Sequence, residues 1–175
     1  MKTLRFAALA ASLAVAAPVA RVHAQAKLDD PTIVAIFDAA NTWDIETATL
    51  GEKKGTTKEI RELATMFVHD HSNVRQQGRD LAKKLGVTPT PPKDFALAKD
   101  HAAAMKKLEG LSGKAFDKAF LENEVAFHKA VIDAVTTTLL PALKNAEVKD
   151  LVTKVAPAFQ AHMLAAQNLL DKQGK

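Results

Sequence analysis

The sequence predicts an all-helical protein, an antiparallel four-helix bundle with a short extra helix in the connection between the second and third long helices. Alanine, leucine and lysine are abundant, and these residues favour helices. Four long segments repeat apolar residues at alternating steps of three and four, the spacing of one helix face. Glycine, proline and capping residues separate these segments.

The N-terminal residues have the layout of a secretory signal peptide. A basic start, residues 1–5, precedes an apolar run, residues 6–17, and small residues at Val22 and Ala24 fit a cleavage site. The run is shorter than the roughly 20 residues that span a bilayer, although an uncleaved anchor is the alternative. We therefore expect a signal peptide at residues 1–24, a single domain at 25–175, and no membrane span after cleavage.

The predicted mature domain has a nearly balanced charge and no cysteine. Removing residues 1–24 leaves a formal charge of +1, which gives no electrostatic reason to expect nucleic-acid binding. Without cysteine the domain is held together by packing alone, and thiolate catalysis and cysteine-based zinc sites are excluded.

Start and stop signals divide the first half of the domain into two helices. Asp30 is the expected cap of a first helix at residues 31–54, which Gly55 ends. The sequence Thr56-Thr57-Lys58-Glu59 matches a capping box and predicts a second helix that continues to about Leu85.

The second half begins with a proline-rich linker, residues 88–92, which no helix can enter. A short helix at residues 94–109 follows, and Ser112 is the expected cap of a third long helix that runs to about Thr138. We expect Pro141 to break the chain there.

The last long helix is expected at residues 146–171, capped by Asn145 and kinked at Pro157. The turns before the second and fourth long helices are short, so each joins antiparallel neighbours.

Ionisable residues interrupt the apolar stripe of every long helix. His71 lies at the centre of the stripe of the second helix and His162 inside that of the fourth. Asp44 is the odd residue on the core-facing side of the first helix. Glu124 and His128 are four residues apart on the third helix and point to the same side. The five residues lie at roughly similar heights, so they can meet near the middle of the bundle.

Three explanations account for these inward polar groups, because burying them unpaired costs several kcal/mol each. One transition-metal ion could bind them, with His71, Glu124, His128 and His162 as ligands and Asp44 as a fifth ligand or a supporting group. They could form a metal-free Asp–His and Glu–His hydrogen-bond network. Some could instead face a wet groove. Zinc, copper and iron(II) all accept imidazole and carboxylate ligands.

The spacing does not match a standard two-iron site, which places a Glu three residues before a His on two helices. Here Glu124 and His128 are four apart. Neighbouring polar residues are expected to have ordinary roles: His69 on the surface, Asp70 in a surface ion pair rather than orienting a ligand histidine, and His101 in partly buried packing.

Several segments resemble domain of unknown function 4142, a ferritin-like family of exported bacterial proteins. The most specific are Met66-Phe67-Val68-His69-Asp70-His71 and the run Leu111-Ser112-Gly113-Lys114-Ala115-Phe116-Asp117, with further matches around Asn41–Glu46, Glu124–His128 and Ala161–Gln167. The resemblance covers residues 31–170 and implies a ferritin-like fold and a periplasmic location. Many members carry Asp where this chain has Phe127.

Two functions follow as hypotheses. The first is a periplasmic metal-binding protein that stores, buffers or senses a transition metal. The second is a non-enzymatic envelope scaffold or stress protein whose buried polar network fixes the helix register. No motif indicates a substrate or reaction, so enzymatic activity at the ion and the protein partner both stay open.

Overall fold

The computed structural model describes residues 28–92 and 96–173, and within these ranges every regular element is helical. The prediction of an all-helical chain is confirmed. The predicted signal peptide, its cleavage site and the expected helix start at Asp94 lie outside the described residues. Within the described ranges, no helix combines the length and the apolar character that crossing a membrane requires.

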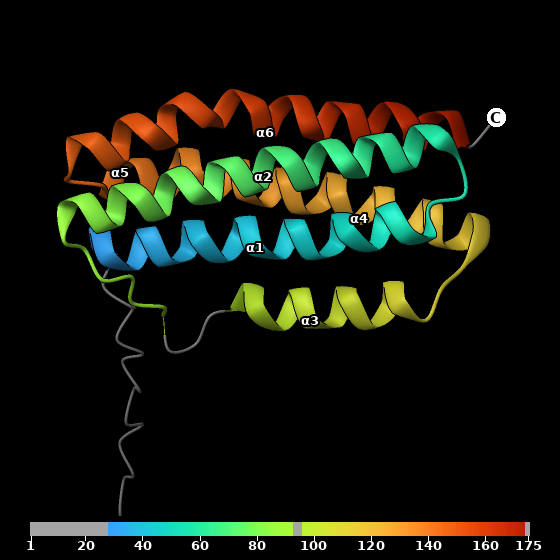
Figure 1. The fold of residues 1–175 in the computed structure, drawn as a ribbon, viewed down its shortest axis with the longest axis horizontal. Coiled ribbons are helices and arrows are strands. Elements are labelled where there is room, and N and C mark those ends of the chain that lie inside the picture. The colour runs from blue at the N-terminus through green and yellow to red at the C-terminus, as the bar shows by residue number, and fades with distance from the viewer. Residues whose placement is uncertain (1–27, 93–95, 174–175) are drawn as a thin grey trace, which may run out of the picture.

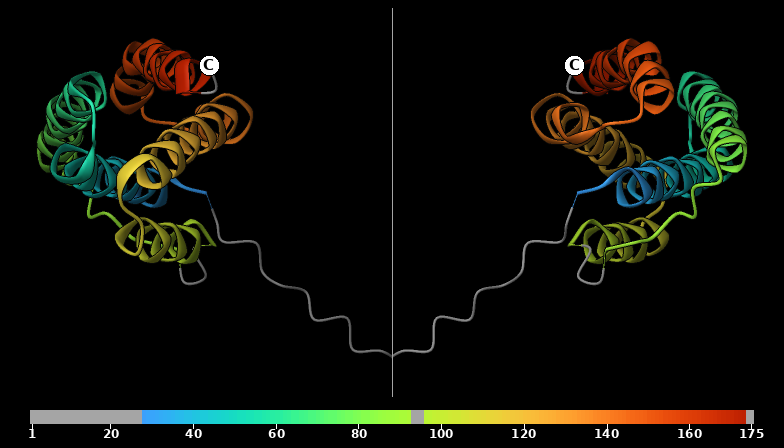
Figure 2. Two further views of the ribbon diagram at one scale, coloured as in Figure 1. Left: turned by 90° about the vertical axis from the view of Figure 1, so that its right-hand side faces the viewer. Right: turned by 90° about the vertical axis from the view of Figure 1, so that its left-hand side faces the viewer.

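Four long helices lie side by side: α1 (Asp30–Lys54), α2 (Lys58–Leu85), α4 (Gly113–Ala134) and α6 (Ala146–Gln173). Figure 1 shows α1 running opposite to α2, and α4 running opposite to α6. Viewed from the ends, the four surround a common interior (Figure 2). The shorter α3 (Ala96–Glu109) lies outside them, packed on α1 and α4.

The helix caps differ by one residue from those expected. Asp29, rather than Asp30, caps α1 and accepts from the Thr32 amide at 3.2 Å. Asp30 instead accepts from the amides of Lys144 and Asn145, both at 2.9 Å, and so ties the start of α1 to the turn before α6. Tertiary contacts therefore decide which of two adjacent acidic residues caps the helix.

The same shift occurs at α2, where Thr57 is the cap and its hydroxyl accepts from the Ile60 amide at 3.3 Å. Thr56 donates from its amide to Asp117 on α4 at 3.0 Å, and its hydroxyl also bonds that carboxylate. The prediction of a capping box that starts at Thr56 is wrong, because Thr56 hydrogen-bonds Asp117 of α4 instead of capping α2. Asn145 does cap α6, accepting from the Val148 amide at 3.1 Å.

Pro141 does not break the chain after Thr138. Instead α4 continues through a π-helical turn, η1 (Val135–Leu139), into a short helical turn, α5 (Leu140–Ala142). The Leu140 amide donates to the Val135 carbonyl, five residues earlier. Pro141, which has no amide hydrogen to donate, lies in the first turn of α5, directly after this π-helical turn.

The interior contains two apolar clusters with a polar layer between them. The first cluster surrounds Phe37 and Val152 and lies toward the start of α1; the second surrounds Phe67 and Phe120 and lies toward its end. In α1 the buried polar residues Asn41 and Asp44 come between Phe37 and the second cluster. The residues that the sequence singled out therefore form one cross-section of the core.

Candidate metal centre

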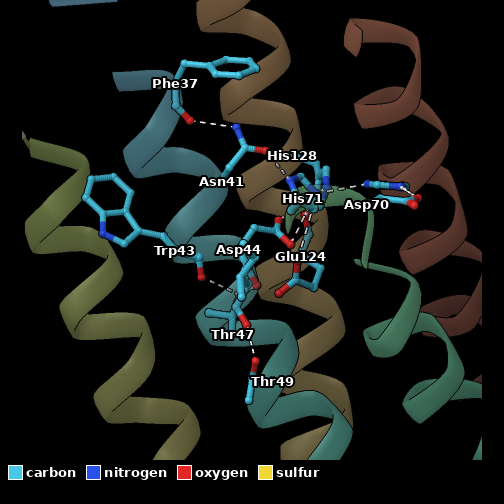
Figure 3. A network of polar contacts seen from close by, with 12 residues as sticks. Phe37, Asn41, Trp43, Asp44, Thr47, Thr49, Asp70, His71, Glu124 and His128 are labelled. Carbon is cyan, nitrogen blue, oxygen red and sulfur yellow. Dashed lines mark hydrogen bonds and ion pairs between the residues drawn. The ribbon is translucent and has the colours of Figure 1, made fainter. Parts of the chain in front are cut away.

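All five predicted site residues lie in this polar layer, contributed by α1, α2, α4 and α6. Asp44, His71, Glu124, His128 and His162 are at most 4% exposed. Figure 3 shows the side chains of Asp44, His71, Glu124 and His128 pointing toward one interior region. The expectation that these polar groups meet agrees with the geometry, and the wet-groove interpretation does not, because none of the five faces solvent.

The orientation of His71 is fixed by Asn41. The Asn41 side-chain nitrogen donates to the Phe37 carbonyl at 2.8 Å, which leaves its oxygen to face Nδ1 of His71 at 2.9 Å. An amide oxygen only accepts, so Nδ1 of His71 carries the hydrogen and Nε2 is bare. The bare Nε2 points into the layer, 3.4 Å from Oδ1 of Asp44.

The orientation of His128 is fixed by its own helix. Its Nδ1 donates to the backbone carbonyl of Glu124 at 2.9 Å, which again leaves Nε2 bare. That Nε2 lies 3.5 Å from Oδ2 of Asp44. It makes no hydrogen bond with any described residue.

His162 is oriented by a carboxylate on a neighbouring helix. Its Nε2 lies 3.0 Å from Oδ2 of Asp70 on α2, so Nε2 donates and Nδ1 is bare. The bare Nδ1 faces Nε2 of His71 at 3.2 Å. Asp70 therefore orients a buried histidine, and the expectation of a simple surface ion pair is wrong. Its other oxygen does meet the exposed His69, at 3.0 Å.

Three bare ring nitrogens thus converge, and the three histidines each offer a nitrogen within 4.8 Å of the other two. Two facing lone pairs at 3.2 Å repel unless a proton or a cation lies between them. A ligand nitrogen that is bare while its ring partner donates to an oxygen is the usual state of metal-bound histidine.

The two buried carboxylates bring further electron-donating atoms close to these bare nitrogens. Asp44, Glu124 and His128 form a second group of close ligand atoms that shares His128 with the first. Both carboxylate oxygens of Asp44, both of Glu124 and Nε2 of His128 are buried without a hydrogen-bond partner among the described residues. Burying such groups without hydrogen-bond partners costs free energy, so we expect protons or a cation to bind in the layer.

Burial sets the protonation state of the carboxyls and imidazoles in the layer, because it disfavours their charged forms. Burial raises the pKa of Asp44 well above its usual range, and the nearby Glu124 raises it further. Burial raises the pKa of Glu124 to about 7, although Thr47 and Asn123 offset part of this effect. Burial lowers the pKa of His71 to about 2 and that of His128 to about 4. His71 and His128 are therefore neutral at physiological pH.

Burial also lowers the pKa of His162, although Asp70 raises it in part. Partial burial raises the pKa of Asp70, but the hydrogen bonds and charges of His69 and His162 outweigh it, and the net pKa is lowered. Asp70 is thus an ionised acceptor for the imidazole at neutral pH.

Aromatic rings close the layer on both sides. Phe67 packs on His128 and His162, with ring centroids 5.2 and 4.8 Å apart, and Phe159 stacks on His71 at 5.5 Å. These contacts restrict rotation of the imidazoles and keep bulk water from their faces.

Sequence reasoning missed Asn41, and it preferred a surface ion pair for Asp70 over the histidine-orienting role that the structure shows. Asn41 precedes Asp44 by three residues and shares its face, a spacing that could have revealed it. The role of Asp70 depends on α6, and no local signal indicates it. His101 is nearly buried, as expected, but it also bonds Glu46 at 2.7 Å and stacks on Trp43.

Comparison with solved structures shows this fold in two proteins of low sequence identity. The crystal structure of a DUF305 fragment from Deinococcus radiodurans matches with a TM-score of 0.72 at 14% identity, covering 81% of this chain and 95% of that one. The Cu(II)-bound form of CopM matches with a TM-score of 0.61 at 14% identity, covering 82% and 98%. No curated protein matches the chain.

Comparison with family models gives one assignment, which agrees with the resemblance in the sequence. The model of DUF4142, a domain of unknown function, matches residues 15–169, nearly the whole chain. The chain therefore belongs to the DUF4142 family.

Proposed function

We propose that this protein binds one transition-metal ion in its polar layer and stores, buffers or senses that metal. The ligands are Nε2 of His71, Nε2 of His128, Nδ1 of His162 and a carboxylate oxygen of Asp44, with Glu124 as a further ligand or as the carboxyl that shares a proton with Asp44.

The observation that carries this proposal is the set of buried nitrogen and oxygen atoms at ligand-like separations. In a tetrahedral site with bonds of about 2.0–2.1 Å, neighbouring ligand atoms lie about 3.3–3.4 Å apart. The separations here are 3.2 Å between His71 and His162, 3.4 Å between His71 and Asp44, and 3.5 Å between His128 and Asp44. A cation satisfies these atoms together and removes their mutual repulsion.

The ligand types favour zinc, copper or iron(II), since all three accept imidazole and carboxylate. The likeness to the Cu(II)-bound form of CopM supports including copper among the metals tested. A single ion suits the inventory better than two, because the Glu124–His128 spacing is not that of a two-iron site.

We further propose that the four long helices form an antiparallel four-helix bundle of the ferritin-like kind, and that residues 1–24 direct export to the periplasm. The opposite directions of α1 and α2 and of α4 and α6, and the long connection through α3, support the first point. The basic and apolar N-terminal sequence supports the second.

Metal analysis of protein purified without a histidine tag tests the function. We expect about one equivalent of metal, and a melting temperature that falls with chelator and rises when zinc, copper or iron(II) is added, because a ligand that binds only the folded state stabilises it. His71→Ala should abolish both effects. Gln76→Ala, at an exposed side chain on the same helix, should change neither.

The second candidate is an envelope scaffold whose polar layer fixes helix register without metal. The hydrogen bonds between Asn41 and His71 and between Asp70 and His162, which join different helices, favour it. Under this function, neither chelator nor added metal changes the melting temperature of the wild type. His71→Ala lowers stability equally with and without metal.

A further inference from the structure

We propose that the pocket between α1, α3 and α4 is an entry chamber in which a hydrated divalent transition-metal cation binds on its way to the polar layer. The inference rests on the metal-binding function proposed above and names the route by which the ion reaches the buried ligands.

The pocket has room and suitable chemistry. Its volume is about 240 Å³, far more than the roughly 10–15 Å³ that one water requires. Asp100 and His101 of α3 line it, and Glu46 holds His101 in place at 2.7 Å. No lysine or arginine is among the described residues that line it. Carboxylate and imidazole groups attract and transiently bind divalent cations.

The inner wall of the pocket adjoins the proposed centre. Thr47 and Asn123 line the pocket, and their side chains also interact with the buried carboxyl of Glu124. Figure 3 shows Trp43 and Thr47 on the α1 ribbon beside Asp44, with Trp43 directed toward the α3 ribbon. Thr47 and Asn123 therefore lie between the pocket and the buried carboxyl of Glu124.

Phe127 is the partition between the pocket and the histidines. It lines the pocket, and it also lines a small and more open cavity of about 10 Å³ whose other lining residues include His71 and His128. The small cavity is only about large enough for one water, so an ion that passes this way must shed its hydration shell and displace the phenyl ring. Beside Phe127, Ala126 and Ala130 leave the α4 wall of the pocket open.

The route past α2 and α6 is less suited. There the hydrogen bond between Asp70 and His162 closes the layer, and Asp70 is itself needed to orient that imidazole. The ion would have to break a contact that prepares its own ligand. The α3 side offers a pocket and requires movement of one apolar ring.

Loading kinetics test the chamber. Metal-free protein is mixed with cobalt(II), whose visible absorption reports binding, in a stopped-flow instrument. Ala104→Phe fills the pocket and should slow loading about tenfold. Ala103→Phe, on the exposed outer face of α3, should load at the wild-type rate. Phe127→Ala should load several times faster. All variants should reach the same final stoichiometry, because no proposed ligand is changed.

The fluorescence of Trp43, the only tryptophan, shows whether α3 stays in place, since its indole stacks on His101. An Ala104→Phe protein that keeps the wild-type emission and loads at the wild-type rate overturns the chamber. If that substitution displaces α3, Phe127→Ala decides: an unchanged rate overturns the chamber. Equal rates of cobalt loading in the wild type and in all three variants refute the chamber alone, whereas a wild type that binds no metal removes the proposed function as well.

Discussion

At the scale of single residues, the layer is organised by oxygen atoms that hold the far side of each imidazole. Asn41, the Glu124 carbonyl and Asp70 each accept from one histidine and so determine which nitrogen faces inward. These supporting contacts matter for affinity because they select the ring tautomer before an ion arrives.

Asn41→Ala should weaken metal binding by about 10- to 100-fold, because His71 loses the acceptor that keeps its Nε2 bare. Chelator competition gives the affinity, and circular dichroism confirms that the helices are intact. Asn73→Ala removes an exposed asparagine on α2 and serves as the control. Equal affinities for the two variants would contradict the assigned role of Asn41.

Glu124→Gln should stabilise the metal-free protein by about 2–3 kcal/mol at pH 8 and by about 1 kcal/mol or less at pH 5. The folded-state pKa of Glu124, about 7, is raised above the usual value of 4.5, so the wild type loses stability as pH rises from about 4.5 to about 7. At pH 5 the buried carboxyl is already neutral, and the glutamine gains little.

Urea unfolding at the two pH values measures this difference. Asp133→Asn, at an exposed carboxylate paired with Lys129, should show no such pH dependence. A Glu124→Gln benefit that is the same at both pH values would mean that the carboxyl does not titrate in the folded chain as described.

The sequence predicted which residues turn inward but not how they are supported. The alternation of three and four placed His71 and His162 in core-facing stripes, because burial follows from helix geometry alone. The partners of these histidines depend on how neighbouring helices are rotated. Asp70 is part-exposed on its own helix and gains its role only from the approach of α6.

At the scale of helices, the observed cap differs from the predicted cap where the predicted residue makes a contact with another element instead. Thr56 and Asp30 are good caps by sequence, yet each is used to tie two helices together. Gly86 followed its local signal, adopting φ 64° to end α2, because no other element competes for it.

Gly51 allows α1 and α4 to approach closely, so Gly51→Ala should destabilise the protein by about 1–3 kcal/mol. An added Cβ would lie 2.6 Å from Cζ of Phe120, a ring that is fully buried. Gly110→Ala is the matched control, since its Cβ would meet only ordinary contacts at 3.6 Å and should change stability by less than about 0.5 kcal/mol. Unfolding in urea compares the two, and equal losses would argue against a tight α1–α4 contact.

At the scale of the whole molecule, the polar layer divides what would otherwise be one continuous apolar core. The all-helical class could be predicted because helix-forming composition and the three-and-four spacing of apolar residues recur in every long segment. The sequence predicted a meeting point near the middle of the bundle, but the alignment of residues on separate helices within the layer depends on the turns and on the π-helical segment η1.

Replacing the layer with apolar residues should raise the stability of the metal-free protein by about 1–4 kcal/mol and abolish metal binding, because buried charged groups are costly without a cation. The variant changes the three histidines to Leu and Asp44 and Glu124 to Met. Thermal unfolding with and without zinc provides the measurement. A less stable or poorly cooperative variant would instead support the scaffold function, in which the polar contacts specify the fold.

Under the proposed metal-binding function, the phenylalanine rings that pack on the imidazoles also limit how a bound ion can change its oxidation state. Copper(II) favours square-planar coordination, whereas copper(I) favours fewer, tetrahedrally arranged ligands. The imidazoles of His71 and His128, which each contact both Phe67 and Phe159, cannot flatten around the ion without disturbing these rings. Reduction of bound copper should therefore be easier here than in a flexible peptide, whereas zinc, which has no redox chemistry, should be held without this strain.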